Sequence, residues 1–182
     1  MLPGTYDCGD GPRLLRRGRG MLLGAALLGG VASFLLVPVF GALEILDPAS
    51  GRVILWVAME PGEEFHVCFI HSVNRRPVCD TYAWEWSRLV VVRSRFDSFG
   101  AGMPDGSTED GALHILSDGW LEWRGHRPLS EVTIRVGRVA GHRLFIKARE
   151  IPLEQLVQPG QALTFRSGRT SAWDRFTGRC MQ

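Results

Sequence analysis

Apolar and polar positions alternate with a period of two along most of the chain after residue 42, as they do in β-strands with one buried face. Turn-forming clusters separate these runs, for example at residues 47–51, 125–128 and 158–160. Only residues 153–157 have a pattern that suits a helical turn. About ten short strands with frequent turns predict a mainly β fold, an antiparallel β-sandwich or barrel, over residues 42–166.

An uncharged run of twenty residues, 21–40, precedes this region. At ~1.5 Å per residue it is long enough to cross a bilayer as one transmembrane helix or signal anchor. Four arginines lie in residues 1–20, so the positive-inside rule predicts a cytoplasmic tail there and a periplasmic domain after the span. We therefore expect a single-pass inner-membrane protein that contacts the lipid bilayer through 21–40 and ends in a flexible tail, 167–182. A cleaved signal peptide, which would leave a soluble periplasmic protein, is the alternative.

The densest alternation lies at residues 65–86, where two strand patterns flank a polar break. It predicts a β-hairpin with its turn centred on Val73 and Asn74. In that register Cys68 faces Cys79 across the ladder. Export would place both in an oxidising compartment, so a cross-strand disulfide is the main hypothesis, and two buried free thiols are the alternative.

The same register puts His71 and Asp80 on the apolar face of the hairpin, where a carboxylate can fix the tautomer of an imidazole. Their separation along the ladder is roughly 13 Å at ~3.3 Å per residue, so contact requires a twist or a bulge. His71 and Ser72 are adjacent, with side chains on opposite faces, which disfavours a nucleophile–base pair and a serine hydrolase. No catalytic residue is assigned, and a structural histidine bonded to backbone is the alternative for His71.

Metal-binding and nucleic-acid-binding functions are disfavoured by the pattern of residues. His66 and Cys68 point away from His71, and the chain has no His-Glu-x-x-His or paired Cys-x-x-Cys motif, so we expect no metal. After residue 20 the chain carries seventeen basic and seventeen acidic residues, which argues against a general nucleic-acid binder. Arg75 and Arg76, at the predicted hairpin tip, are candidates for holding a carboxylate bidentately, and a solvated turn is the alternative.

The stretch 97–111 has no periodicity, and a loop of this length in a compact β domain is often functional. Gly100, Ala101 and Gly102 have almost no side chain, so their amides can approach a ligand closely. They do not form a dinucleotide fingerprint, because the third glycine and its helix are missing, and we expect no cofactor. A plain surface loop is the alternative.

These features predict one ligand- or partner-binding site, in which the loop folds back over the hairpin corner. Phe99 is expected to pack toward the apolar face, and the backbone of 100–102 is expected within about 8 Å of the hairpin corner. The predicted site residues are His71, Ser72, Arg75, Asp80, Phe99, Gly100, Ala101 and Gly102.

Three motifs in this order resemble the bacterial family known as domain of unknown function 1850: residues 69–73, then Pro77-Val78 followed by Asp80, then 98–104. The resemblance covers about residues 42–166. It differs at Asp80, where the family usually has glutamate, and at the two hairpin cysteines. Members are small exported or membrane-anchored proteins, often encoded beside TAXI-type tripartite ATP-independent periplasmic transporters.

The resemblance implies an accessory role in solute uptake, with components of such a transporter as partners, and it implies no reaction. We therefore expect a membrane-anchored periplasmic accessory domain that binds a ligand or a partner and serves the uptake of an organic anion. The alternatives are a small exported, hydrolase-like enzyme that uses His71 and Asp80, and a structural module of the cell envelope.

Overall fold

The computed structural model describes residues 29–30, 33–100, 103, 106–177 and 180–181. The chain divides into two compact units, Met1–Val37 and Pro38–Gln182. Within the described part of the chain, no helix is both long and apolar enough to span a bilayer. Half of the predicted span 21–40, namely residues 21–28 and 31–32, lies outside the described residues, and so do residues 1–20.

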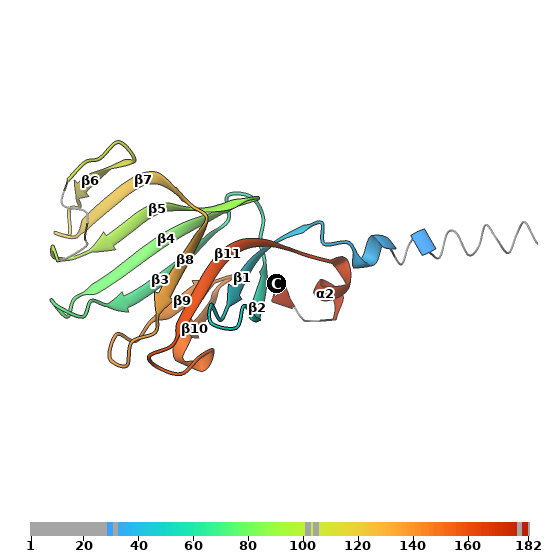
Figure 1. The fold of residues 1–182 in the computed structure, drawn as a ribbon. Helices are drawn as coiled ribbons and strands as arrows, with labels where there is room; N and C mark the ends of the chain where they lie inside the picture. Colours follow the sequence, from blue (N-terminus) through green and yellow to red (C-terminus); the bar gives the residue numbers. More distant parts are fainter. Residues whose placement is uncertain (1–28, 31–32, 101–102, 104–105, 178–179, 182) are drawn as a thin grey trace, which may run out of the picture. The chain divides into compact units, whose positions relative to one another are not determined.

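The second unit is built from two β-sheets, as predicted for a mainly β, antiparallel protein (Figure 1). One sheet has the strand order β12-β2-β1-β11-β8, and the other has the order β10-β9-β3-β4-β5-β7-β6. All pairings of the described strands are antiparallel except that of β12 with β2. The strands are β1 (Phe40–Leu46), β2 (Val53–Ala58), β3 (Glu64–Ile70), β4 (Pro77–Glu85), β5 (Arg88–Phe96), β6 (Gly111–Ile115), β7 (Leu121–Leu129), β8 (Glu131–Arg135), β9 (Arg143–Ile146), β10 (Arg149–Pro152), β11 (Ala162–Thr170) and β12 (Cys180–Met181).

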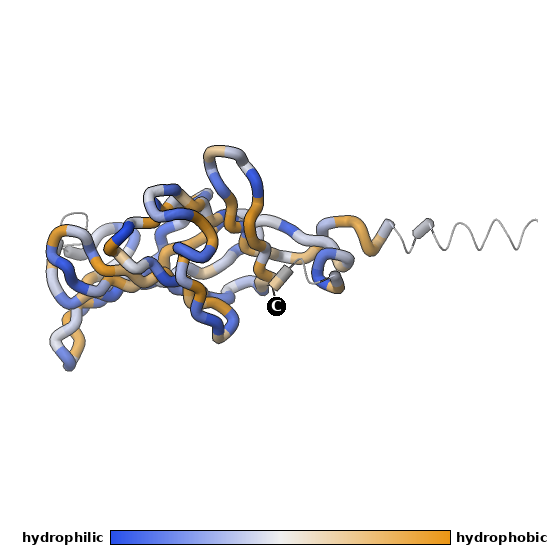
Figure 2. The backbone as a smooth tube through the Cα atoms, turned by 90° about the horizontal axis from the view of Figure 1, so that it is seen from below, coloured by the Kyte–Doolittle hydropathy of each residue, from blue (hydrophilic) through white to orange (hydrophobic). Residues whose placement is uncertain are grey.

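The apolar core lies between the two sheets, because the alternating strands turn their hydrophobic side chains inward. Phe65 of β3 stacks on Phe165 of β11, with ring centroids 6.1 Å apart. Trp84 of β4 donates its indole N–H to the carbonyl oxygen of Ala42 in β1 at 2.9 Å, which satisfies a buried polar group and ties the sheets together. Figure 2 shows hydrophobic residues along the strands and hydrophilic residues in many of the turns.

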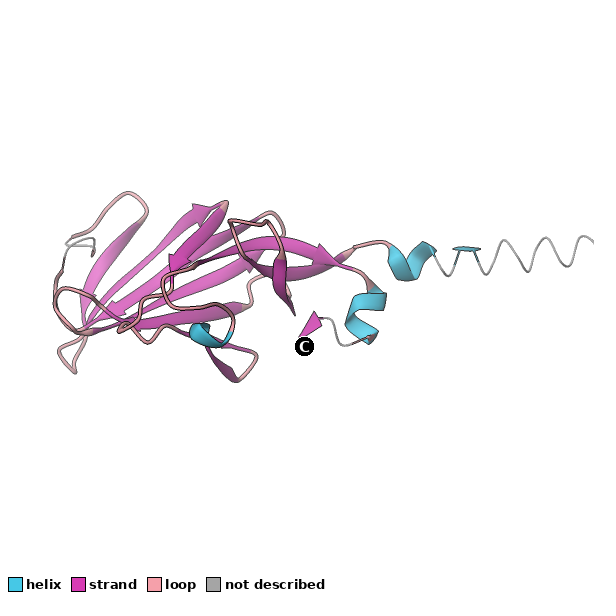
Figure 3. Ribbon diagram, turned by 60° about the horizontal axis from the view of Figure 1, so that its bottom comes forward, coloured by secondary structure: helices cyan, strands magenta, loops and turns pink. Residues whose placement is uncertain are grey.

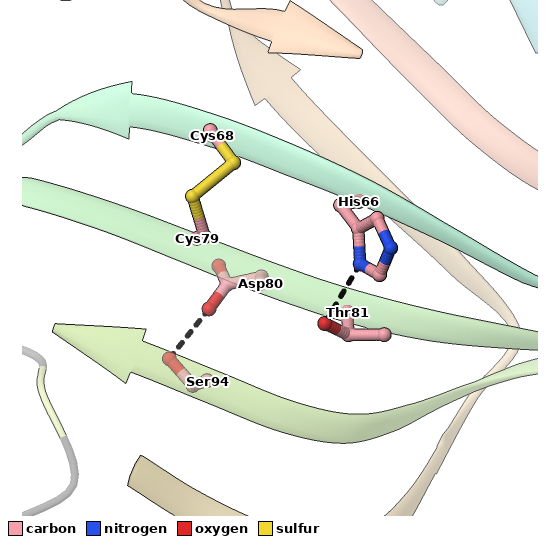
Figure 4. Close-up of a disulfide and its surroundings, with 6 residues drawn as sticks. All are labelled: His66, Cys68, Cys79, Asp80, Thr81 and Ser94. Atoms are coloured by element: carbon pink, nitrogen blue, oxygen red, sulfur yellow. Dashed lines mark hydrogen bonds between the residues drawn. A yellow bond between two sulfur atoms is a disulfide. The ribbon is translucent and has the colours of Figure 1, made fainter. Parts of the chain in front are cut away.

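The central hairpin forms in the predicted register. Ile70 pairs with Pro77 at the end of the β3–β4 ladder, which centres the turn between Val73 and Asn74. Cys68 pairs with Cys79, and the two form a disulfide with a Cα–Cα distance of 4.1 Å, so the predicted bridge is confirmed (Figure 4).

Two segments differ from the sequence-based expectations. A turn was expected at 125–128, but β7 runs through these residues as far as Leu129. Its partner β6 ends at the pair Gly111–Gly125, so beyond that point β7 has a free edge, where Pro128 is tolerated. In place of a flexible tail from residue 167, β11 continues to Thr170.

The short helix α2 (Ala172–Phe176) follows β11 (Figure 3). It starts with a capping box: Ser171 accepts from the backbone N–H of Asp174, and the Asp174 side chain accepts from the backbone N–H of Ser171. A single 3₁₀ turn, η1 (Leu153–Gln155), stands where the sequence predicted a helical turn.

Candidate functional site

A cleft of about 540 Å³ lies at the end of the sandwich that carries the β3–β4 turn. This volume is within the usual range for small-molecule sites. The lining residues come from both sheets, from the β3–β4 turn, from the loop after β5 and from the segment between β8 and β9: Phe69, Ile70, His71, Ser72, Val78, Asp80, Ser94, Met103, Arg135, Gly137, Ala140 and His142.

The β3–β4 turn presents His71 and Ser72 to this cleft. The turn is closed by its own hydrogen bonds, since the N–H of His71 donates to the carbonyl of Arg76 at 2.8 Å and the N–H of Arg75 donates to the carbonyl of His71 at 2.9 Å. The N–H of Val73 donates to Nδ1 of His71 at 3.3 Å, which orients the imidazole. The rigid turn therefore fixes where the ring of His71 lies.

Asp80 lines the cleft from β4 and is paired with β5 rather than with the imidazole of the turn. The hydroxyl of Ser94 donates to Oδ1 of Asp80 at 2.6 Å (Figure 4). Burial raises the pKa of the Asp80 carboxyl, and the bond from Ser94 opposes this only in part. Burial, together with the nearby Asp80, also raises the pKa of Tyr82. The cleft thus has a carboxyl group that takes up a proton more readily than an exposed aspartate does.

His142 is a second imidazole in the cleft, and it was not among the site residues predicted from the sequence. Its ring stacks on Phe69 with centroids 5.2 Å apart, and its Nδ1 accepts a hydrogen bond from the N–H of Gly137 at 3.4 Å. Burial lowers the pKa of His142, so the neutral ring is favoured. Because Nδ1 is an acceptor, the neutral ring carries its proton on Nε2.

Arg135 provides the guanidinium of the cleft lining. It is the last residue of β8 in the opposite sheet, and its Nη1 donates to the carbonyl of Gly160 at 3.1 Å. No local sequence pattern points to this residue, because only the packing of the two sheets brings β8 beside the β3–β4 hairpin. A guanidinium in a partly apolar cleft is suited to an anionic group.

The arginines of the turn are placed differently from the sequence-based expectation. Arg75 is at the tip with a φ of 55°, in the left-handed region, and it is not part of the cleft lining. Arg76 forms an ion pair with Asp97 at 2.6 Å. The cation that lines the cleft is therefore Arg135, while the turn contributes His71 and Ser72.

The start of the glycine loop lies against the hairpin turn. Nδ2 of Asn74 donates to Oγ of Ser98 at 3.1 Å and to the carbonyl of Phe99 at 3.4 Å. A Cβ placed on Gly100 would be 3.4 Å from Cε1 of His71 and 3.0 Å from Nδ2 of Asn74. Gly100 and the hairpin corner are thus in contact, as the sequence predicted for this part of the loop. A side chain at Gly100 would crowd the corner of the cleft.

The other predicted loop residues, Phe99, Ala101 and Gly102, can be located only in part. Ala101 and Gly102 lie outside the described residues, whereas Met103 lines the cleft. Phe99 packs edge-on against Phe96 with centroids 6.0 Å apart, but 54% of its surface is exposed. Phe99 therefore packs on the buried Phe96, as predicted for the apolar face, and the rest of its ring is exposed to solvent.

The outer face of the hairpin carries the disulfide and His66 rather than a metal site. Nδ1 of His66 is 2.9 Å from Oγ1 of Thr81, and Cys68 is bonded to Cys79 (Figure 4). Among the described residues, no group of three or more histidine, cysteine, aspartate or glutamate side chains is placed to hold a metal ion.

Comparison with known proteins gives one match. No curated protein and no solved structure matches the chain. Residues 65–153 match the model of the family described as Domain of unknown function (DUF1850). All the cleft-lining residues, from Phe69 to His142, lie inside this segment. The match supports membership of residues 65–153 in that domain family.

Proposed function

We propose that the domain is a non-enzymatic, membrane-anchored periplasmic module that binds a small organic anion in the cleft and assists its uptake. The observation that carries this proposal is Arg135, a guanidinium that lines a cleft of about 540 Å³ together with apolar side chains. Such a lining matches an anionic head group joined to a short hydrocarbon part.

The polar groups around Arg135 fit the same ligand. The rings of His71 and His142 are held by backbone N–H groups, so they are preoriented as hydrogen-bonding partners. Burial raises the pKa of Asp80, which favours its neutral form, and a neutral carboxyl group repels an anion less than a carboxylate does. Asp80 accepts a hydrogen bond from Ser94 of β5, which holds its carboxyl group in place at the wall of the cleft.

Periplasmic placement is supported by the disulfide between Cys68 and Cys79, because disulfides persist in oxidising compartments. The anchor at residues 21–40 and the partnership with a TAXI-type tripartite transporter remain parts of this proposal. They are supported by the length of the uncharged run and by the family match. Affinity purification from solubilised inner membranes should recover the membrane component of such a transporter, and its absence would remove the partnership.

The test of the binding site is calorimetric titration of the purified full chain with succinate, glutarate, 2-oxoglutarate and hexanoate. We expect at least one acid to bind, and we expect Arg135→Gln to weaken its binding about tenfold or more, since a hydrogen bond to a charged group contributes about 1.5–3 kcal/mol. The matched control is Arg138→Gln, which changes an exposed arginine outside the cleft lining. Lack of binding by the wild type, or equal losses in both variants, would contradict the proposed site.

A further inference from the structure

The end of the sandwich opposite the cleft carries a group of exposed aromatic side chains. We call Trp86, Trp173 and Phe176 the aromatic end; their surfaces are 50%, 48% and 86% exposed. Trp86 lies between β4 and β5, and the other two belong to α2. In Figure 1, α2 and the start of β1 lie at this end, away from the β3–β4 turn.

Trp86 and the helix α2 each contact the rest of the domain, Trp86 through β4 and α2 through the start of β1. Trp86 packs edge-on against the buried Trp84, with ring centroids 5.3 Å apart. Arg175 holds the helix α2 against the start of β1. Its Nη2 donates to the carbonyl of Gly41 at 3.0 Å, and its guanidinium lies 4.7 Å from the ring centroid of Phe40. These contacts place Trp86 and the helix α2 at the same end of the domain.

A groove beside α2 adds to this surface. It has a volume of about 430 Å³ and is lined by Phe40, Ala172, Arg175 and Phe176. Arg169 of β11 adds a second guanidinium, 6.0 Å from the ring centroid of Trp86. Exposed tryptophan and phenylalanine interleaved with arginine are typical of surfaces at the membrane–water interface, where the rings reach the acyl boundary and the cations meet phosphate groups.

Two acidic side chains at this end, Glu85 and Asp174, have partners within the protein. Glu85 forms an ion pair with Arg88 at 2.5 Å, and the side chain of Asp174 accepts from the hydroxyl of Ser171 at 2.6 Å in the helix cap. Their negative charges are thus partly compensated within the protein. An anionic lipid surface would meet little repulsion from these two groups.

The segment that precedes β1 in the chain indicates what covers the aromatic end. The uncharged run 21–40 ends at Phe40, which is also the first residue of β1. We propose that the aromatic end lies against the headgroup region of a phospholipid bilayer, with Trp86, Trp173 and Phe176 at the acyl boundary. This inference rests on the proposed anchor at 21–40, because an anchor that ends at Phe40 holds the start of β1 at the membrane surface.

The six tryptophans of the chain make the proposal testable by fluorescence. The full chain is reconstituted into vesicles of phosphatidylcholine and phosphatidylglycerol, with and without brominated acyl chains, which quench only nearby tryptophans. Wild type is compared with the double variant Trp86→Phe/Trp173→Phe. The matched control is Trp120→Phe, since Trp120 lies beside Arg95 near the far end of β5. Flotation of the vesicles reports anchoring separately.

We expect the double variant to lose at least half of the quenchable fluorescence and the Trp120→Phe variant to lose little, while all three proteins float with the vesicles. Equal quenching of wild type and double variant, with flotation retained, would overturn the aromatic end as a membrane face and leave the anchor standing. Failure of the wild type to float would overturn both. Neither outcome depends on anion binding by Arg135, so the proposed anion site in the cleft stands or fails separately.

Discussion

Removal of the disulfide by the double substitution Cys68→Ser/Cys79→Ser is the most direct test of how the β3–β4 hairpin is stabilised. The bridge joins directly opposed residues of β3 and β4 that are 11 positions apart in the sequence. It therefore closes a short loop that contains the whole cleft-lining turn. In the unfolded chain this closure removes conformations that the reduced protein regains.

The size of the effect follows from the length of that loop. For a closed loop of about twelve residues, the chain-entropy relation gives about 3 kcal/mol at 25 °C. At roughly 3 °C per kcal/mol for a domain of this size, the midpoint of thermal unfolding should fall by about 10 °C. Because Cys68 and Cys79 are paired in a regular ladder, we expect the variant to keep the hairpin register.

The assay is urea and thermal unfolding of the purified protein, followed by circular dichroism, with and without a phosphine reductant. Reduced wild type and the double variant should unfold at the same midpoint, below that of the oxidised wild type. The reductant should not change the double variant, which serves as the internal control. The loop-closure reasoning would be refuted if the unfolding free energy fell by less than about 1 kcal/mol, or if the reductant did not change the unfolding midpoint of the wild type.

Two further substitutions test the site and the sheet. Burial raises the folded pKa of Asp80 above 3.8, so its contribution to stability is full below pH 3.8 and is lost as the pH rises through the folded pKa. The unfolding free energy of Asp80→Asn relative to wild type should therefore increase from pH 4 to pH 8. The control Glu131→Gln, which changes an exposed side chain, should show no such trend relative to wild type. A difference between Asp80→Asn and wild type that does not vary with pH would contradict the buried carboxyl group. Gly125→Ala should destabilise by about 1–3 kcal/mol in urea unfolding, because its Cβ would meet backbone atoms of the neighbouring segment, while Gly106→Ala, in open space, should stay within about 0.5 kcal/mol. Equal effects of the two alanines would show that the backbone contact at Gly125 is not restrictive.

The central hairpin was predictable because its information is local. A period-two pattern on both sides of a short polar break fixes which residues face each other, and a slip by one residue would expose the apolar set. The Cys68–Cys79 pair and the turn at Val73 and Asn74 follow from this pattern alone. The contact of Gly100 with the turn was also expected, because a loop that follows the central strands can fold back over their end.

The other half of the cleft was not predictable, because it depends on pairings between distant segments. Arg135 reaches the cleft only because β8 joins the sheet opposite the hairpin, and His142 reaches it through the segment that leads into β9, the neighbour of β3. Neither pairing can be predicted from the residues that neighbour Arg135 and His142 in the sequence. Local reasoning instead favoured Arg75, whose proximity to His71 in the sequence does not place it in the cleft lining.

The matched segment and the rest of the domain have different roles in this arrangement. All the cleft-lining residues lie within 65–153, but the strand that carries Arg135 depends on residues outside that segment. In the described sheet, β8 is an edge strand whose ladder partner is β11, and β11 in turn pairs with β1. The bond from Arg135 to the carbonyl of Gly160 adds a second tie to the same region. A fragment limited to 65–153 would lack β11, so β8 would have no strand to hold it opposite the hairpin. The flanking strands therefore complete the cleft by fixing the position of its guanidinium. The segment at their ends, from Thr170 into α2, carries most of the aromatic surface proposed to meet the membrane.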